Sequence, residues 1–234
     1  TYYQQGRLTD LFADQSFEHR LFSIHQAMAG DCHELLTGIS GKRKTAAMFY
    51  VMTLPEILDL VGFLIGPEIL AHPQFNARAK LPDRTSVVPW HQDLGYLHKS
   101  AEETFMVNIW LPLVDANAEN GCLEVIRGSH NCGILPYNSG GAEDLVPESI
   151  PEGEVVCCPL QVGGVLMLQH KTVHRSTPNF SNHIRWSLDI RYSDPALPTG
   201  RDHVPGFLVR SVSQPNRVAK NHHDWLKLFA ENED

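Results

Sequence analysis

Apolar residues recur at helical spacing through the first third of the chain. Between residues 16 and 37 they fall three or four positions apart, which predicts an amphipathic helix. This stripe comprises Phe17, Leu21, Ile24, Met28, Leu35 and Leu36. A second helix is predicted over residues 53–65, where Thr53 and Glu56 have the spacing of a capping box. We therefore expect residues 1–68 to form a mainly helical flank.

From about residue 70 the pattern changes to short alternating segments separated by Pro, Gly and Asn, which is typical of an all-β sandwich or barrel. The clearest predicted strands are Thr104–Leu111, Cys122–Ile126, Val165–His170 and Ile184–Tyr192. Asn120-Gly121 is a tight-turn signal before the second of them. Residues 137–154 are expected to form a long surface loop. The whole chain, 1–234, is expected to be one domain with a barrel at 70–193.

The C-terminal segment 194–234 is predicted to be irregular and to end in a short amphipathic helix. That helix would bury Trp225, Leu228 and Phe229 on one face.

Two of the predicted strands carry polar residues along one face. Asn108 and Trp110 share a face of the first, and alternation places Arg185, Ser187, Asp189 and Arg191 together on the last. In a barrel, a polar inward face marks a ligand cavity. A solvent-exposed face gives the same alternation, and on this pattern alone the solvent-exposed interpretation is favoured.

Composition narrows the class of protein. The chain has 234 residues, 42% of them hydrophobic, and a net charge of −8, which does not fit the basic surface of a nucleic-acid binder. Its five cysteines include no C-x-x-C pair, which indicates reduced thiols in a cytoplasmic protein. Apolar runs are too short to cross a bilayer. We expect a small-molecule partner, with no nucleic acid and no membrane; the oligomeric state stays open.

Candidate chemistry begins at His91-Gln92-Asp93. On an extended strand, residues two apart project from one face, so the imidazole of His91 and the carboxylate of Asp93 would point to one place. His174, at the end of a predicted strand, is the best third ligand. Two histidines and one carboxylate bind Fe(II) on one side and leave positions open for a cosubstrate and O2. Gln92, between them, is expected to point to the opposite face.

Arg185 makes this set more specific than a metal site alone. It lies eleven residues after His174, at the start of the next inward-facing strand. Its planar guanidinium would grip a carboxylate with two hydrogen bonds, as the distal carboxylate of 2-oxoglutarate requires.

The chain resembles the phytanoyl-CoA dioxygenase family of Fe(II)- and 2-oxoglutarate-dependent oxygenases from roughly Thr53 to Tyr192. The stretches that carry the resemblance are Thr53-Leu54-Pro55-Glu56-Ile57-Leu58, His91-Gln92-Asp93-Leu94, Asn120-Gly121-Cys122-Leu123, Arg127-Gly128-Ser129-His130, His174-Arg175-Ser176 and Arg185. The resemblance implies a double-stranded β-helix, a jelly-roll or cupin-like barrel. It also implies Fe(II), 2-oxoglutarate and O2, with ascorbate helpful in vitro.

By the same resemblance, His91, Asp93 and His174 bind iron and Arg185 holds the C5 carboxylate of 2-oxoglutarate. Ser176 matches the hydroxyl that joins that grip, and Trp110 matches the tryptophan that lines the pocket. The chain departs from the family at Gly163-Gly164, where a Gly-Asp pair is common, and in lacking an upstream glycine-aromatic strand pattern.

Several further side chains are candidates with an equally plausible structural role. Asn108 would bond the cosubstrate or serve as a buried structural amide. Asn76, Arg78 and Lys80 alternate on a predicted strand, so one or two of them would line the pocket. For Lys80, an exposed edge position is at least as plausible. His170 is expected to be structural.

The expected reaction is hydroxylation, or another oxidation, of an unactivated C–H bond in a small metabolite, with 2-oxoglutarate decarboxylated to succinate and CO2. Alternatives are an acyl-CoA 2-hydroxylase of the phytanoyl-CoA type and a non-catalytic metal-binding jelly roll that acts as a sensor. A halogenase is disfavoured because the retained Asp93 fills the coordination position that chloride needs.

Overall fold

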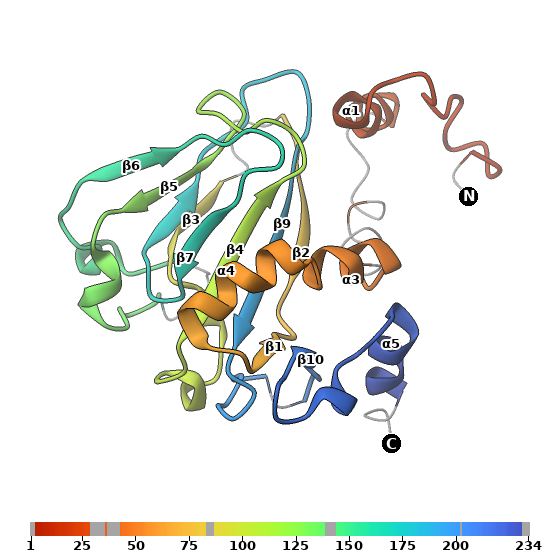
Figure 1. The fold of residues 1–234 in the computed structure, drawn as a ribbon. Coiled ribbons are helices and arrows are strands. Elements are labelled where there is room, and N and C mark those ends of the chain that lie inside the picture. Colours follow the sequence, from red (N-terminus) through yellow and green to blue (C-terminus); the bar gives the residue numbers. More distant parts are fainter. Residues whose placement is uncertain are drawn as a thin grey trace.

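The computed structural model describes residues 3–28, 36, 43–82, 87–138, 144–201 and 203–230. Two antiparallel sheets form the body of the molecule, and helices flank one of them (Figure 1). The prediction of a mainly β fold with flanking helices is confirmed.

The larger sheet has six strands in the order β10-β1-β9-β4-β7, with β2 also pairing with β9. Its strands are β1 (Ile69–Ala71), β2 (Asn76–Lys80), β4 (Met106–Pro112), β7 (Leu166–Gln169), β9 (Arg185–Ser193) and β10 (Phe207–Arg210). The longest strand, β9, lies between β4 on one side and β1 and β2 on the other. β9 is therefore the central strand of this sheet.

The smaller sheet has four strands in the order β3-β8-β5-β6. They are β3 (Val88–His91), β5 (Leu123–Ile126), β6 (Val155–Cys158) and β8 (His174–Ser176). The turn before β5 is built as its sequence predicts, with Gly121 at φ 83° and the Cys122 N–H donating to the Asn117 carbonyl at 2.9 Å.

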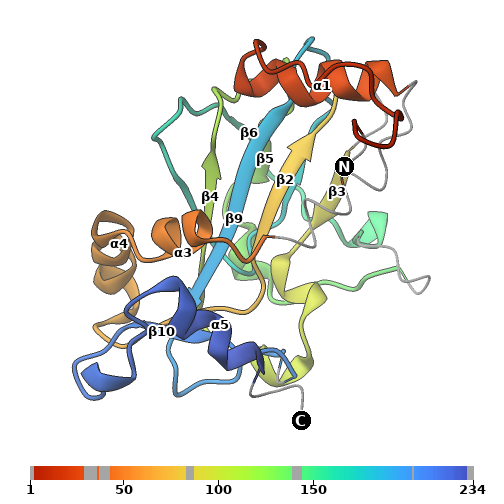
Figure 2. The same ribbon diagram turned by 90° about the vertical axis from the view of Figure 1, so that its right-hand side faces the viewer.

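Four α-helices are described: α1 (Phe17–Ala27), α3 (Ala46–Met52), α4 (Pro55–Ile65) and α5 (His222–Ala230). Short 3-10 helices are η1 (Asp93–Tyr96), η2 (Lys99–Ala101), η3 (Ser129–Cys132), η4 (Pro147–Ser149) and η5 (Pro215–Arg217). Figure 2 shows α1 over one end of β2 and β9, where Phe17 stacks on Trp186 with ring centroids 5.2 Å apart. Of the first predicted helix, residues 29–35 and 37 lie outside the described part of the chain.

No single described helix is long and apolar enough to cross a bilayer, although α3 and α4 together, bent by 45°, meet the criteria of length and composition.

The main core lies between the larger sheet and the helices α3, α4 and α5. Leu188, Ile190 and Tyr192 on the apolar face of β9 pack there. Trp225 of α5 is 1% exposed and contacts the rings of Phe49, Phe75 and Phe207. Burying each such side chain contributes about 1.5–3 kcal/mol. Because this core takes one face of β9, the polar face of the strand is left to form a cavity.

One local prediction, the capping box at Thr53, needs correction. Thr53 does not cap the second helix: it ends α3, and its hydroxyl donates to the Phe49 carbonyl at 2.9 Å. The N-cap of α4 is Leu54, which offers no side-chain hydrogen bond, and Pro55 has no N–H to satisfy.

The predicted surface loop 137–154 is anchored in its described part. Leu145 is 2% exposed, pairs with Tyr137 in an isolated bridge, and packs beside Ile126 and Val173. Its burial reflects an apolar side chain within a polar segment, which composition averaged over the segment conceals.

Candidate metal centre and cosubstrate cavity

Antiparallel pairing of β3 with β8 brings His91 and His174 together. The two residues are direct partners in the register, and their ring centroids lie 4.1 Å apart. Residues opposite each other in an antiparallel pair have neighbouring Cβ atoms, so both imidazoles project to the same side of the sheet. This one strand pair therefore brings together two histidines that lie far apart in the sequence.

Asp93 reaches the same point from a different backbone conformation than predicted. The strand β3 ends at His91, and Asp93 is the first residue of η1, so the H-x-D segment is not one continuous extended strand. The carboxylate still lies 4.0 Å from His91 Nε2 and 3.9 Å from His174 Nε2. Potential ligand atoms of the three residues all lie within 4.8 Å of one another, and all three side chains are buried.

Each histidine is fixed with one ring nitrogen toward Asp93. His91 Nδ1 lies 2.9 Å from the Pro89 carbonyl, and His174 Nδ1 lies 2.9 Å from the Thr172 carbonyl. Because a carbonyl only accepts, each Nδ1 carries the proton and each Nε2 keeps its lone pair for a metal. Burial, followed by the neighbouring His174, lowers the pKa of His91 to about 3. The ring is therefore neutral, as metal ligation requires.

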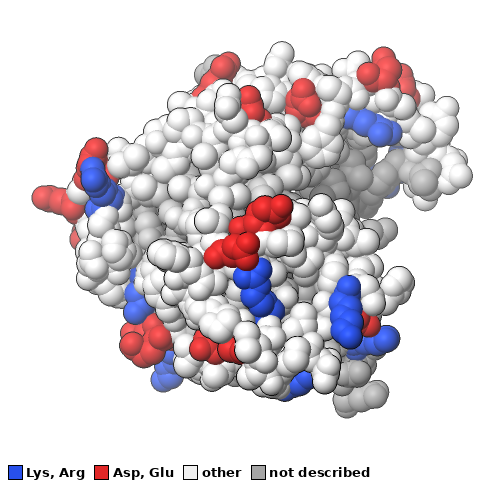
Figure 3. Space-filling view, viewed as in Figure 1, with Lys and Arg blue, Asp and Glu red and all other residues white. Residues whose placement is uncertain are grey.

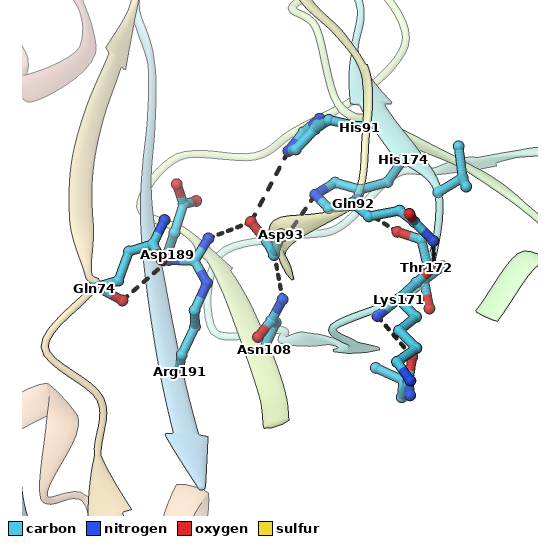
Figure 4. A network of polar contacts seen from close by, with 12 residues as sticks. Gln74, His91, Gln92, Asp93, Asn108, Lys171, Thr172, His174, Asp189 and Arg191 are labelled. Atoms are coloured by element: carbon cyan, nitrogen blue, oxygen red, sulfur yellow. Dashed lines mark hydrogen bonds and ion pairs between the residues drawn. The ribbon is translucent and has the colours of Figure 1, made fainter. Parts of the chain in front are cut away.

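The carboxylate of Asp93 is held from both sides. Figure 4 shows it at the centre of a network in which Arg191 donates to Oδ1 and Asn108 donates to Oδ2. Arg191 also donates to the Gln74 carbonyl at 3.0 Å. Burial alone would raise the pKa of Asp93, but Arg191 and the two histidines lower it well below its usual range. The ligand is thus ionised and fixed in orientation.

Arg191 was not among the predicted site residues. The signal was present, because alternation already placed Arg191 on the same face as Arg185. Asn108 was expected either to bond the cosubstrate or to serve as a buried structural amide. It lines the cavity and donates to Asp93, while its Oδ1 has no hydrogen-bond partner among the described residues.

Gln92 points away from the ligands, as predicted. Its amide donates to the carbonyls of Gly133 and Lys171 at 2.8 and 2.7 Å, and it accepts from the Leu135 N–H at 2.9 Å. These bonds tie the backbone between the two ligands to two neighbouring loops. His170 is structural in its contacts: it is buried, and its Nδ1 accepts from the Met106 N–H at 3.1 Å.

At the other end of the same cavity lies Arg185. It is 2% exposed, sits over the Trp110 ring at 5.3 Å, and donates to Ser187 Oγ at 2.6 Å. Its Nε has no hydrogen-bond partner among the described residues, and burial lowers its pKa to about 10. A buried guanidinium with an unused donor is suited to bind an anion.

Ser176 and Lys80 lie beside this arginine. Lys80 is opposite Arg185 in the β2–β9 register, and its Nζ donates to Ser176 Oγ at 3.1 Å. Ser176 also accepts from the Val88 N–H at 3.3 Å. The exposed-edge interpretation of Lys80 is therefore wrong: its side chain is 6% exposed, because β2 pairs with β9 and the Gly121 turn lies against the lysine stem.

These groups share one cavity of about 290 Å³. The predicted site residues that line it are Asn76, His91, Asp93, Asn108, Trp110, His174, Ser176 and Arg185. The cavity also contains Arg78, Lys80, Asp189 and Arg191. A metal-ligating triad and a buried guanidinium thus face the same space, and this arrangement can hold a metal together with a chelating carboxylic acid.

Comparison with known sequences gives several matches. The chain is 34% identical over 187 residues to the L-proline trans-4-hydroxylase of Streptomyces griseoviridis, which covers 70% of the chain and 69% of that protein. It is 32% identical over 150 residues to phytanoyl-CoA dioxygenase domain-containing protein 1 of Rattus norvegicus, covering 61% of the chain and 51% of that protein. The chain spans about half or less of the length of the phytanoyl-CoA relatives it matches.

One solved structure of similar fold contains iron and alpha ketoglutarate. The epimerase SnoN, in complex with Fe3+, alpha ketoglutarate and nogalamycin RO, superposes with a TM-score of 0.55 at 25% identity. The match covers 69% of this chain and 65% of that one. This likeness confirms the double-stranded β-helix and agrees with a donor set suited to iron and 2-oxoglutarate.

The sequence profile of the family described as phytanoyl-CoA dioxygenase (PhyH) matches residues 8–187, more than half of the chain. The chain therefore belongs to the phytanoyl-CoA dioxygenase family.

Proposed function

We propose that this protein is an Fe(II)- and 2-oxoglutarate-dependent dioxygenase that hydroxylates an unactivated C–H bond of a small organic metabolite. His91, Asp93 and His174 would hold the iron, and Arg185 would hold the distal carboxylate of 2-oxoglutarate. When bound, the iron and 2-oxoglutarate supply the oxidising chemistry, in which O2 is consumed and succinate and CO2 are released.

One observation carries this proposal: the buried Arg185 and the triad line the same cavity. Unlike Arg191, which bonds Asp93, Arg185 keeps a buried Nε with no hydrogen-bond partner among the described residues, and burying a cation costs several kcal/mol unless an anion pairs with it. The C5 carboxylate of bound 2-oxoglutarate would supply that anion in the cavity that the triad also lines. The non-catalytic alternative leaves Arg185 unexplained.

The chain's own residues orient and exclude water rather than react. Arg191 and Asn108 fix the Asp93 carboxylate, and Trp110 forms an apolar wall under Arg185. Charge-assisted bonds to buried groups hold a ligand more firmly than the same bonds in water. Because Asp93 is present, the coordination position that a halogenase opens to chloride is filled, which supports oxygen transfer.

A small substrate fits better than an acyl-CoA. The cavity, at about 290 Å³, lies near the lower limit of ordinary ligand pockets, and 2-oxoglutarate would take part of it. On the face drawn in Figure 3, acidic and basic side chains are scattered in small groups, and the net charge is −8. Neither observation favours the phosphates of coenzyme A. The hydroxylase named for L-proline matches this chain over about two thirds or more of both proteins, 70% of this chain and 69% of that one.

The test is 2-oxoglutarate turnover, measured as succinate released by protein reconstituted with Fe(II) and ascorbate. We expect turnover in the wild type and its loss in Asp93→Ala and Arg185→Ala. The exposed Arg127, which pairs with Glu154, provides the matched control Arg127→Ala. Anaerobic calorimetry separates the two roles, since Asp93→Ala should lose metal binding and Arg185→Ala should lose only 2-oxoglutarate binding. Full turnover in either variant would contradict the assignment.

A further inference from the structure

A second ion pair lies in the cavity in addition to the triad and Arg185. Arg78 of β2 donates through Nε to the Asp189 carboxylate of β9. In the register, Arg78 is opposite Ser187 and Asp189 is opposite Asn76, so the pair spans the two strands diagonally. Both residues line the cavity.

This pair is open to a ligand, unlike the ion pair at the metal centre. The side chains of Arg78 and Asp189 are 44% and 16% exposed, whereas those of Arg191 and Asp93 are 3% and 7% exposed. A partly exposed ion pair contributes only about 0–1 kcal/mol to stability. Exchanging it for contacts with a bound molecule therefore costs little.

We propose that Arg78 and Asp189 bind the zwitterionic head group of a free α-amino acid, which is the substrate that the cavity oxidises. The substrate carboxylate would bond Arg78, and its ammonium group would bond Asp189. This inference rests on the proposed oxygenase function and specifies its substrate class.

Charge complementarity favours a zwitterion over other small acids. A simple carboxylic acid that took Arg78 would leave the Asp189 carboxylate without its partner in a partly buried site, which is unfavourable. A simple amine would leave Arg78 in the same situation. A molecule with adjacent negative and positive groups satisfies both side chains at once, as they now satisfy each other.

The position of the pair suits a substrate beside the metal. Asp189 lies two residues before Arg191 on the same face of β9, which is roughly 7 Å along the strand. Arg191 bonds the metal ligand Asp93. Arg185, at the other end of the strand, belongs to the cosubstrate. A head group held at Asp189 thus leaves the amino-acid side chain to extend toward the metal centre.

The experiment compares amino acids with derivatives that lack one charge. Wild-type protein with Fe(II), 2-oxoglutarate and ascorbate is assayed for succinate release with each protein L-amino acid. The stimulating compounds are retested as N-acetyl derivatives and as carboxamides. Binding of the same compounds to the Ni(II)- and 2-oxoglutarate-loaded protein is measured by calorimetry. We expect at least one free amino acid to exceed both derivatives by about tenfold or more in each measurement.

Two substitutions then test the residues themselves. Arg78→Gln and Asp189→Asn should each raise the KM of that amino acid by about tenfold or more, because each leaves one charged group of the head group unmatched. Asp189→Asn should also remove the preference for the free amine over the N-acetyl form. Arg127→Gln, which breaks the exposed pair with Glu154, serves as the control.

The outcomes separate this inference from the function on which it rests. Loss of succinate release under every condition would overturn the oxygenase function, and calorimetry still decides amino-acid binding because it needs no turnover. If no free amino acid stimulates turnover or binds, or if the derivatives act equally well, the head-group site is wrong. It is also wrong if Arg78→Gln weakens binding of the cosubstrate and leaves the KM of the amino acid unchanged, since Arg78 would then only neutralise Asp189 beside the cosubstrate.

Discussion

Gly121 lies where the turn before β5 meets the cosubstrate end of the cavity. At φ 83° it has a backbone conformation that L side chains rarely adopt. A Cβ at this position would lie 2.5 Å from the Thr177 carbonyl oxygen and 2.6 Å from Lys80 Cε. Gly128 provides a matched control, since it has φ 78° and no atom within 4 Å of the corresponding Cβ. The substitutions Gly121→Ala and Gly128→Ala therefore share backbone strain and differ in steric overlap.

The structure gives the size of each effect. Placing alanine in the left-handed region costs about 1–2 kcal/mol, and this is the whole expected effect of Gly128→Ala. Gly121→Ala adds an overlap with a backbone oxygen, which cannot rotate away as a side chain can. Forcing such an overlap costs a further 1–3 kcal/mol or so, giving a total of about 2–5 kcal/mol. Thr177 follows Ser176, so relief of the overlap displaces the Lys80–Ser176 contact.

The assay is urea unfolding monitored by tryptophan fluorescence, with the free energy of unfolding and the m-value fitted for both variants. We expect Gly121→Ala to be the less stable variant and, by calorimetry, to bind 2-oxoglutarate more weakly than the wild type. Gly128→Ala should retain wild-type binding. If the two variants agree in stability to within about 0.5 kcal/mol, the Thr177 overlap is not the constraint at this turn.

Further predictions concern the core, pH and the metal. Trp225→Ala should lower the free energy of unfolding by about 3–5 kcal/mol in urea, because the ring is fully buried among aromatic neighbours. Burial lowers the pKa of His72 from 6.5 to about 4, so the unfolded chain binds a proton first as the pH falls. Stability is then complete above pH 6.5 and decreases by up to about 1.4 kcal/mol per pH unit down to pH 4, a slope that thermal unfolding of His72→Asn should show reduced. Arg191→Gln should weaken Ni(II) binding in calorimetry by about 10- to 100-fold, because the Asp93 carboxylate loses the donor that orients it. Supplying chloride to the active wild type should yield no chlorinated product by mass spectrometry, since Asp93 occupies the position that a halide needs.

Strand alternation predicted which side chains share a face, because it depends only on local geometry, but it did not by itself distinguish a cavity from a solvent-exposed face. The polar face of β9 and the apolar face that packs against the helices both follow from the period of two between side chains. The same rule brought His91 and Asp93 to one place, although Asp93 starts a 3-10 helix rather than continuing the strand. Close spacing in sequence tolerates such a change of backbone, because a short segment cannot carry the two side chains far apart.

The predictions for Thr53 and Lys80 failed because both depended on contacts with other segments of the chain. Thr53 and Glu56 have capping-box spacing, but the hydroxyl of Thr53 donates instead to the Phe49 carbonyl of the preceding helix α3. The burial of Lys80 depends on β2 pairing with β9 and on the turn at Gly121, which are contacts between distant segments. A single sequence shows the local pattern of each segment and not which segments meet, so burial of a lysine is not predictable from its own neighbourhood.

The strand β9 determines the spacing between the charged side chains of the site. It carries Arg185 near one end and Arg191 near the other, roughly 20 Å apart along the backbone, with Asp189 on the same face between them. Inserting or deleting one residue between Arg185 and Arg191 would rotate one guanidinium to the helix-covered side, because neighbouring side chains face opposite ways. Changes in chain length are therefore tolerated in the loops and not within this strand. Directed evolution toward other substrates should vary the β2 side of the cavity, at Asn76 and Arg78, and leave β9 unchanged.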